Sequence, residues 1–250
     1  DLVVADDLHS FKPYAVFSGG KMVASEGKLL PPITRQKRHQ LPRKFQMQPL
    51  TPEQLKIQAG NSSQAWVIGL IPHQIVTKKL LMEVPVVNGC FTPAPEKDIA
   101  KLMVVERHKG TGTVGLGLLH GFGLQEGALA SSVAHDSHNL VVVGTNDRDM
   151  LLAAQAVAEL GGGLAIAAKG EILGSLALPI AGLMSDEPID RVAEQLGRLR
   201  QVATELGVKE EYDPFMTLAF LSLPVIPELK LTNRGLVDVS QWKIISVTAN

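Results

Sequence analysis

In the second half of the chain, short apolar runs alternate with longer segments in which hydrophobic and polar residues are mixed. Residues 139–144 and 164–168 are short runs rich in Val, Leu, Ile or Ala, a composition typical of strands buried on both faces. Residues 147–160 lie between them, follow a Thr-Asn-Asp capping sequence and end at three glycines. The pattern predicts a strand, a helix and a second strand, a βαβ-like unit.

A second helix is predicted over residues 188–206. Its apolar side chains recur at steps of three and four residues, which places them on one helical face, and Gly207 follows as a stop signal. Further Val-, Leu- and Ile-rich strands are expected at residues 65–71, 101–106 and 112–119. The apolar, proline-containing tail over residues 215–239 is expected to fold back over the core.

The first 30 residues have a different pattern. Three short strands are predicted at residues 2–5, 15–18 and 21–24, and they are too few to bury a core alone. Because the chain starts inside an apparent strand and without an initiator methionine, we expect it to be a piece of a longer protein. Residues 31–64 contain five prolines and a basic run, which predicts a linker.

The predicted fold class is therefore α/β, with α+β as the alternative. A C-terminal α/β domain with a mixed sheet is expected over residues 65–250, preceded over residues 1–30 by strands of an incomplete small β-sandwich. With 250 residues, of which 45% are apolar, the chain is long enough to bury a sizeable core.

Composition narrows the classes of partner and compartment. A formal net charge of −1 gives no basic surplus for phosphate backbones, so no nucleic acid partner is expected. No membrane partner is expected either, because no window of about 18 residues is apolar and uncharged. The single cysteine, Cys90, excludes an internal disulfide, favours a reducing compartment and predicts a cytoplasmic location.

The densest set of chemically active side chains lies in the run Ser131-Ser-Val-Ala-His-Asp-Ser-His-Asn139, directly before a predicted strand. His135 and His138 are three residues apart, a spacing that on a helix places both imidazoles on one face, where Asp136 can ligate a metal or orient a ring. Ser132 adds a hydroxyl, although no nucleophile-elbow sequence surrounds it. The alternative stays open that these groups only satisfy the backbone at the entrance to the strand.

A second set of candidates consists of Glu106, His108 and His120. Four of the seven histidines lie within residues 108–138, which favours a site. If the strands that carry these residues are neighbours in one sheet, the side chains converge with those of residues 135–138 at one edge.

Several motifs in fixed order resemble the C-terminal domain of bacterial adenine deaminases. They include Val105-Glu-Arg-His108, Ala130-Ser-Ser-Val-Ala-His-Asp-Ser-His-Asn139, Leu178-Pro-Ile-Ala-Gly-Leu-Met-Ser-Asp186 and Leu223-Pro-Val-Ile-Pro-Glu-Leu-Lys230. The resemblance covers roughly residues 60–240. The first 30 residues resemble the strands that follow the catalytic barrel in the amidohydrolase superfamily.

The resemblance implies hydrolysis of adenine to hypoxanthine and ammonia at a binuclear manganese or iron centre. In that family the metal ligands lie on an N-terminal barrel and begin with a His-x-His pair, which this chain lacks. The implied partners are adenine, the barrel part of the same enzyme and, in a homodimer, a second copy of the enzyme. The chain alone is expected to be inactive.

Three roles stay open for residues 131–139: a wall or outer shell of the active site, an accessory metal site at His135 and His138, and a purely structural junction. Glu106, His108, His120, Ser132 and Asp136 are the supporting catalytic candidates. A non-catalytic binding or scaffolding module with the same fold is the alternative function.

Overall fold

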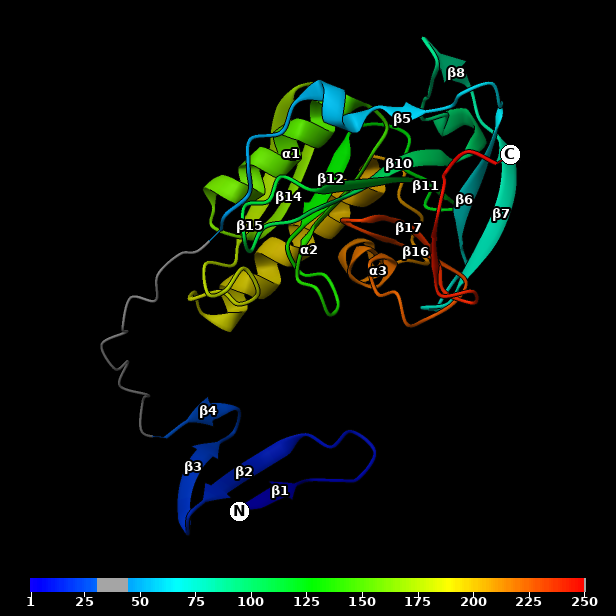
Figure 1. Ribbon diagram of the computed structural model, residues 1–250. Helices are drawn as coiled ribbons and strands as arrows, with labels where there is room; N and C mark the ends of the chain where they lie inside the picture. Colours follow the sequence, from blue (N-terminus) through cyan, green and yellow to red (C-terminus); the bar gives the residue numbers. More distant parts are fainter. Residues whose placement is uncertain (31–44, 250) are drawn as a thin grey trace. The chain divides into compact units, whose positions relative to one another are not determined.

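The computed structural model describes residues 1–30 and 45–249, and the chain divides into two compact units, Asp1–Leu41 and Pro42–Asn250. Figure 1 traces both units along the chain by colour. Residues 31–44 of the predicted linker lie outside the described residues. Within the described part of the chain, no helix is long and apolar enough to cross a membrane.

The smaller unit is one antiparallel sheet in the order β1-β2-β3-β4. Its strands are β1 (Leu2–Ala5), β2 (Pro13–Ser18), β3 (Lys21–Ser25) and β4 (Lys28–Leu29). The three predicted strands are therefore confirmed, with β4 added. Ala15 is the only buried hydrophobic residue among the described residues of this unit, whereas Leu2, Phe11 and Tyr14 are each more than half exposed. The described residues of this unit form a single layer.

The predicted linker extends too far at its C-terminal end, because residues 45–64 belong to the larger unit. A 3-10 turn, η1 (Pro52–Leu55), and a short strand, β5 (Ile57–Gln58), interrupt this segment. Leu55 and Ala59 are completely buried in the cores beside the central sheet. The prolines start and shape a packed segment here and do not mark an open connection.

The larger unit is built on a mixed eight-stranded sheet, which confirms the α/β class. Strand order is β15-β14-β12-β13-β10-β11-β6-β7, and every neighbouring pair is antiparallel except β6 with β11. The strands are β6 (Gln64–Leu70), β7 (Thr77–Glu83), β10 (Ile99–Val105), β11 (Val114–His120), β12 (Ala128–Ser131), β13 (Leu140–Gly144), β14 (Gly163–Ala168) and β15 (Glu171–Ala177).

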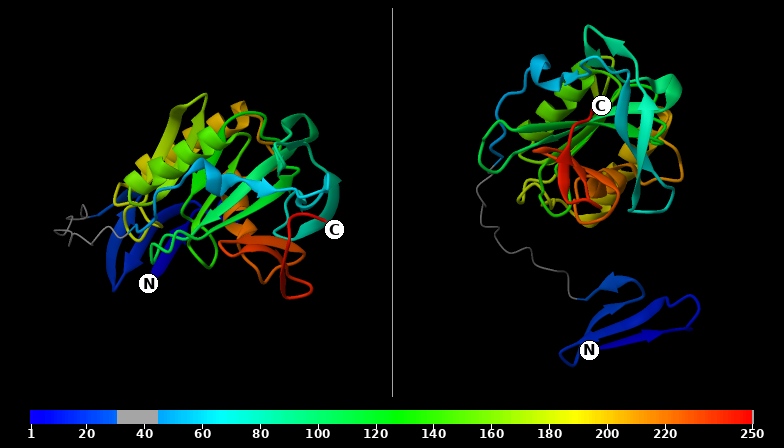
Figure 2. Two further views of the ribbon diagram at one scale, coloured as in Figure 1. Left: turned by 45° about the horizontal axis from the view of Figure 1, so that its top comes forward. Right: turned by 45° about the vertical axis from the view of Figure 1, so that its right-hand side comes forward.

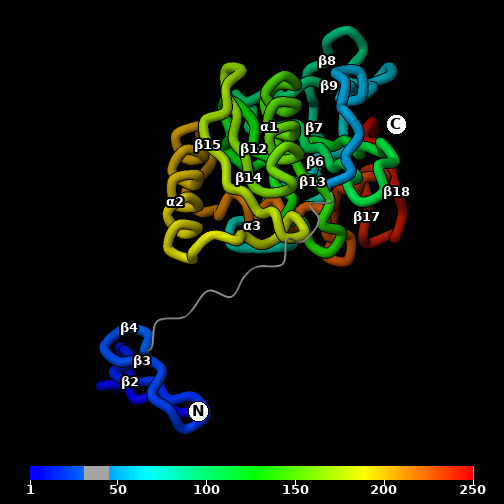
Figure 3. The backbone as a smooth tube through the Cα atoms, turned by 90° about the vertical axis from the view of Figure 1, so that its left-hand side faces the viewer, coloured from blue at the N-terminus to red at the C-terminus, as the bar shows by residue number. Residues whose placement is uncertain are grey.

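Helices cover both faces of this sheet. Successive residues of β10 point to opposite sides, so that Leu102 and Val104 belong to the core that includes residues of α2 (Ile189–Glu205) and α3 (Pro214–Leu221), while Met103 belongs to the core that includes residues of α1 (Asp147–Glu159). Figure 2 shows α1 on one side of the sheet and α3 with the C-terminal strands on the other. Seen from the α1 side, that helix lies along β12 and β14 (Figure 3).

Both predicted helices are confirmed within one or two residues of their ends. The Asn146 side chain accepts a hydrogen bond from the backbone N–H of Asp149, which caps α1, and Gly161 follows the helix with a positive φ of 74°. The predicted βαβ-like unit differs in one respect. β12 lies between β13 and β14 and pairs antiparallel with both, so the two strands joined by α1 are not neighbours.

Two small three-stranded sheets and one turn complete the unit. They are β16 (Leu229–Thr232), β17 (Gly235–Asp238) and β18 (Lys243–Ile245) in one sheet, β5, β9 (Cys90–Phe91) and β8 (Val86–Val87) in the other, and the 3-10 turn η2 (Pro95–Lys97). The C-terminal residues return to the central sheet, where the Trp66 N–H donates to the carbonyl oxygen of Val247 at 2.7 Å. Residues 215–239 pack into the main core, where Leu218 and Leu229 are completely buried, so the predicted folding back of the apolar tail is confirmed, and it includes the unpredicted helix α3.

Candidate functional site

Residues 132–139 connect β12 to β13, two neighbouring antiparallel strands of the central sheet. Ser131 pairs with Val141 across these strands, so the two ends of the connection are fixed by the sheet. The connection contains a turn over residues 135–137 and no helix. The helical spacing assumed for His135 and His138 therefore does not apply.

Ser132 anchors the start of this connection. Its hydroxyl is completely buried, donates to the carbonyl oxygen of Gly182 at 2.6 Å and accepts from the N–H of Gly163 at 2.8 Å. The hydroxyl proton is thus committed to a backbone acceptor. In this arrangement Ser132 ties the end of β12 to the start of β14 and to the turn at Gly182, and it is not placed to act as a nucleophile.

Arg107 anchors the other end, and sequence reasoning did not single it out. It is only 2% exposed, its Nε donates to the carbonyl oxygen of His138 at 2.5 Å, and its Nη2 donates to that of Ala181 at 2.9 Å. Its guanidinium also lies 5.0 Å from the centre of the Phe45 ring. Burial lowers the pKa of Arg107 from its usual value. A basic residue two positions after the fully buried strand β10 is the signal that points to this buried fork.

Glu106 organises the turn that follows β10. Its carboxylate accepts hydrogen bonds from the N–H groups of His108, Lys109 and Thr111 and from the Thr111 hydroxyl. Burial raises the pKa of the Glu106 carboxyl, but the backbone donors and the hydroxyl outweigh it and hold the pKa at about 2. Glu106 is therefore ionised at neutral pH, bound to its own turn and unsuited to donate a proton.

The turn after β10 and the end of the 132–139 connection meet in a polar junction. The His108 ring lies 2.8 Å from the carbonyl oxygen of Ser137, and the Asn139 side chain donates to Asn233 at 3.3 Å. Two buried atoms here, Nδ1 of His138 and Oδ1 of Asn139, have no hydrogen-bond partner among the described residues. The structure thus brings His108 next to Ser137, whereas the Glu106 carboxylate binds only its own turn.

His135 and Asp136 form the exposed tip of the connection. Nδ1 of His135 lies 2.6 Å from Oδ1 of Asp136, and their side chains are 53% and 77% exposed. The imidazole stacks on the ring of Phe220 at 5.3 Å, and the His135 N–H donates to the carbonyl oxygen of Ala219 at 2.9 Å. An imidazole–carboxylate pair is therefore held on α3 while its ring faces solvent, an arrangement suited to proton transfer or to contact with another group.

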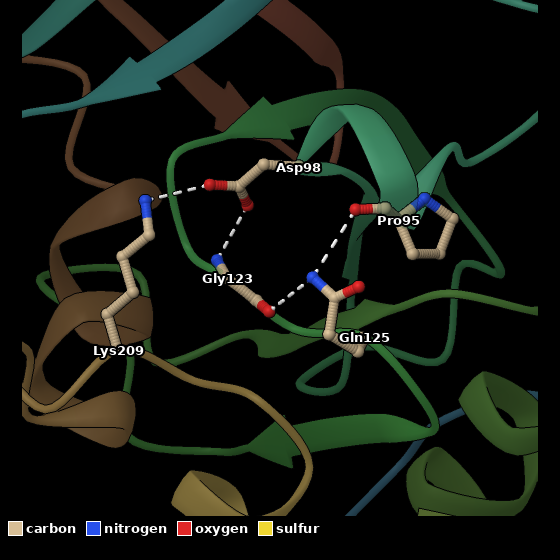
Figure 4. A network of polar contacts seen from close by, with 5 residues as sticks. All are labelled: Pro95, Asp98, Gly123, Gln125 and Lys209. Carbon is tan, nitrogen blue, oxygen red and sulfur yellow. Dashed lines mark hydrogen bonds and ion pairs between the residues drawn. The ribbon is translucent and has the colours of Figure 1, made fainter.

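His120 does not join this group, so its expected convergence is wrong. It pairs with Ile99 at the start of β10, whereas Glu106 follows the end of that strand, about 20 Å away at roughly 3.3 Å per residue. The neighbouring polar contacts are structural (Figure 4). Asp98 accepts from the N–H of Gly123 at 2.6 Å and pairs with Lys209 at 2.8 Å, which fastens the end of α2 to the sheet. Because β10 and β11 are antiparallel, the end of β11 that carries His120 lies at the opposite end of β10 from Glu106.

A binuclear metal centre does not fit the described residues. Nowhere in residues 1–30 and 45–249 do three or more His, Cys, Asp or Glu side chains form a group able to hold a metal ion. His135 is instead engaged by Asp136 and Phe220, and Nδ1 of His138 is buried. The predicted accessory site at His135 and His138 therefore lacks a third ligand within this part of the chain.

Comparison with known proteins places this arrangement in a family. Residues 74–243 match the family described as "Adenine deaminase C-terminal domain". The chain belongs to this family. The matched segment includes the polar junction, the 132–139 connection and all three helices of the adenine deaminase C-terminal domain.

Relatives of the adenine deaminase C-terminal domain are longer proteins. The chain is 56% identical over 252 residues to "Adenine deaminase 2" of Carboxydothermus hydrogenoformans, with 99% of the chain and 43% of that protein covered. It is 52% identical to "Adenine deaminase" of Desulfatibacillum aliphaticivorans and 44% identical to that of Halalkalibacterium halodurans, covering 43% and 42% of those proteins. The chain spans less than half the length of the curated relatives it matches.

Proposed function

We propose that this chain is the C-terminal part of an enzyme that hydrolyses adenine to hypoxanthine and ammonia. The observation that carries the proposal is the match of 99% of the chain, at 56% identity, to 43% of a protein named adenine deaminase. In the proposed reaction water supplies the oxygen of hypoxanthine, and the exocyclic amine leaves as ammonia.

The proposal places the reaction on an N-terminal barrel with a binuclear manganese or iron centre. The described residues do not fit such a centre, so the proposal assigns no metal ligand and no step of the reaction to them. It follows that the 250-residue chain alone does not deaminate adenine. The proposal further places the enzyme in the cytoplasm and allows a homodimer.

The N-terminal sheet supports a partner from the rest of the enzyme. Leu2, Val3 and Phe11 in and beside β1 are 67%, 53% and 59% exposed, and a single four-stranded layer has no second layer to bury them against. We infer that strands from the N-terminal part complete a small β-sandwich over these residues. Burial of exposed apolar surface favours that association.

The tip of the 132–139 connection supports a contact near the substrate. Its two anchors, Ser132 and Arg107, are buried and bound to the backbone, which fixes the loop, while His135 and Asp136 remain exposed. We infer that this pair forms part of the wall of the active site in the whole enzyme. The anchors act as positioning residues because they touch only protein.

The activity of the whole enzyme tests the proposal. The full-length protein is purified with manganese and, separately, with iron, and both ammonia and hypoxanthine are measured after addition of adenine. Equal amounts of the two products are expected, with cytosine and guanine as control substrates. Absence of turnover with either metal contradicts the proposal and leaves the scaffolding alternative.

A further inference from the structure

A cavity of about 270 Å³ lies between the loop after β6, the first turns of α3 and strand β16. Leu70 and Phe220 contribute apolar and aromatic surface to its wall. Ile75 and Met216, which also line it, are 45% and 53% exposed and therefore lie toward its mouth. The cavity is near the lower end of the size range of small-ligand pockets, which begins at roughly 300 Å³.

A lysine forms part of this wall and has few partners. Lys230 on β16 is completely buried, and its Nζ donates to the carbonyl oxygen of Ile75 at 2.7 Å. Ile75 lines the same cavity, so the ammonium group lies at the cavity wall. Within the described residues, Nζ donates only this one hydrogen bond, although an ammonium group carries three N–H donors. Burial lowers the pKa of Lys230 to about 8.

The carboxylates around the cavity do not neutralise this ammonium group. Asp213 lines the cavity, but it pairs with Arg200 and accepts from the N–H groups of Phe215 and Met216 at the start of α3. Glu211 also lines the cavity and is exposed, and no ion pair joins either carboxylate to Lys230 in the described chain. A buried cation without a paired anion is costly, and a bound anion offsets that cost.

We propose that this cavity binds a small, planar monocarboxylate, with one carboxylate oxygen accepting a hydrogen bond from Nζ of Lys230 and the apolar body against Phe220. A single ammonium group suits a monoanion. A phosphate dianion commonly requires several cationic donors or an arginine fork, which this cavity does not offer among its lining residues. The cavity size limits the ligand to about one ring.

Titration of the 250-residue chain with benzoate tests the proposal. Chemical shifts of Tyr212 and Thr217, which line the cavity, are followed by NMR as benzoate is added, with benzamide as the uncharged probe of the same shape. Saturable shifts are expected with benzoate, and binding of benzamide is expected to be at least about tenfold weaker, because it lacks the charge that pairs with Lys230. No saturable shift, or equal affinity for the two probes, overturns the proposal.

A matched pair of variants locates the charge. Lys230→Met keeps the length of the side chain and removes the ammonium group, whereas Lys97→Met removes an exposed lysine on η2 outside the cavity. Benzoate binding is expected to weaken at least about tenfold in Lys230→Met and to stay unchanged in Lys97→Met. Undiminished binding by a folded Lys230→Met variant overturns the proposal. If that variant does not fold, the benzoate-to-benzamide ratio of the unmodified chain decides.

Discussion

The Nε atom of Arg107 lies 2.5 Å from the carbonyl oxygen of His138, and the same guanidinium reaches the carbonyl oxygen of Ala181 from its Nη2 atom. Two loops that are about forty residues apart in sequence are thereby held by one buried side chain. A Cβ atom added at Gly182, whose φ is 74°, would lie 2.8 Å from this guanidinium, so the loops approach it closely. The 132–139 connection owes its position to this fork.

Replacement of Arg107 by lysine is expected to destabilise the domain. A lysine has no planar fork with which to reach two carbonyl oxygens on different loops, so one buried acceptor loses its partner. We expect the free energy of unfolding in urea to fall by about 2 kcal/mol. Arg191→Lys is the control, because Arg191 forms an exposed pair with Glu187 and its replacement is expected to change stability by less than about 0.5 kcal/mol. Equal effects of the two replacements contradict the assigned role of Arg107.

Glu106→Gln is expected to remove a pH-dependent contribution to stability. The folded pKa of about 2 lies below the ordinary 4.5, so the ionised carboxylate stabilises the fold above pH 4.5, and this contribution is lost as the pH falls toward 2. The two proteins are expected to differ by on the order of 2 kcal/mol in unfolding free energy at pH 7, and the difference is expected to shrink between pH 4.5 and 2.

Urea unfolding at several pH values measures this difference. Glu96→Gln is the matched control, since Glu96 is exposed on η2, and it is expected to change stability little at any of these pH values. A difference between the original protein and Glu106→Gln that stays constant down to pH 2 argues against the turn-capping role.

Much of the central sheet and two helices follow from local sequence. The capping sequence before α1, the three glycines after it and the apolar steps along α2 are read within each segment, because these signals act over only a few residues. Helix α3 cannot be predicted from the spacing of its hydrophobic residues, because nearly all of its residues are apolar. Asp213 followed by Pro214 is nevertheless a helix-start signal. Strand β12 is not predicted from the sequence, because it has only four residues, which are too few to show a hydrophobic pattern.

The sequence predicts only part of the candidate site, because local signals act over only a few residues. Glu106 and His108 directly follow β10, the neighbour of β13, so their proximity to residues 137–139 follows from strand pairing. The separation of His120 results from the antiparallel pairing of β10 with β11, and the role of Arg107 depends on backbone atoms far along the chain. Neither relationship is encoded in a local pattern.

Ser132→Ala is expected to lower the unfolding free energy by about 2 kcal/mol, because it leaves the carbonyl oxygen of Gly182 and the N–H of Gly163 without this buried partner. Ser137→Ala, at an exposed position in the same connection, is expected to cost less than about 1 kcal/mol. Equilibrium unfolding in urea compares the two variants. A larger loss for Ser137→Ala is incompatible with Ser132 as the anchor.

His135→Ala in the full-length enzyme is expected to lower kcat/KM for adenine by at least about tenfold while the domain keeps its thermal stability, because the exposed ring contributes little to packing. His120→Ala, at the opposite end of β10, is expected to leave kcat/KM within about twofold. The steady-state kinetics of both variants measure the contrast. Loss of activity in His120→Ala with full activity in His135→Ala reverses the assignment of the exposed tip.

The central claim is that this C-terminal domain supports a deamination carried out elsewhere in the whole enzyme. Ammonia release from adenine, measured in parallel for the full-length protein and for the 250-residue chain at equal concentration with manganese or iron, tests it most directly. The account predicts turnover by the full-length protein and none above background by the chain alone. Metal-dependent turnover by the purified chain alone contradicts it.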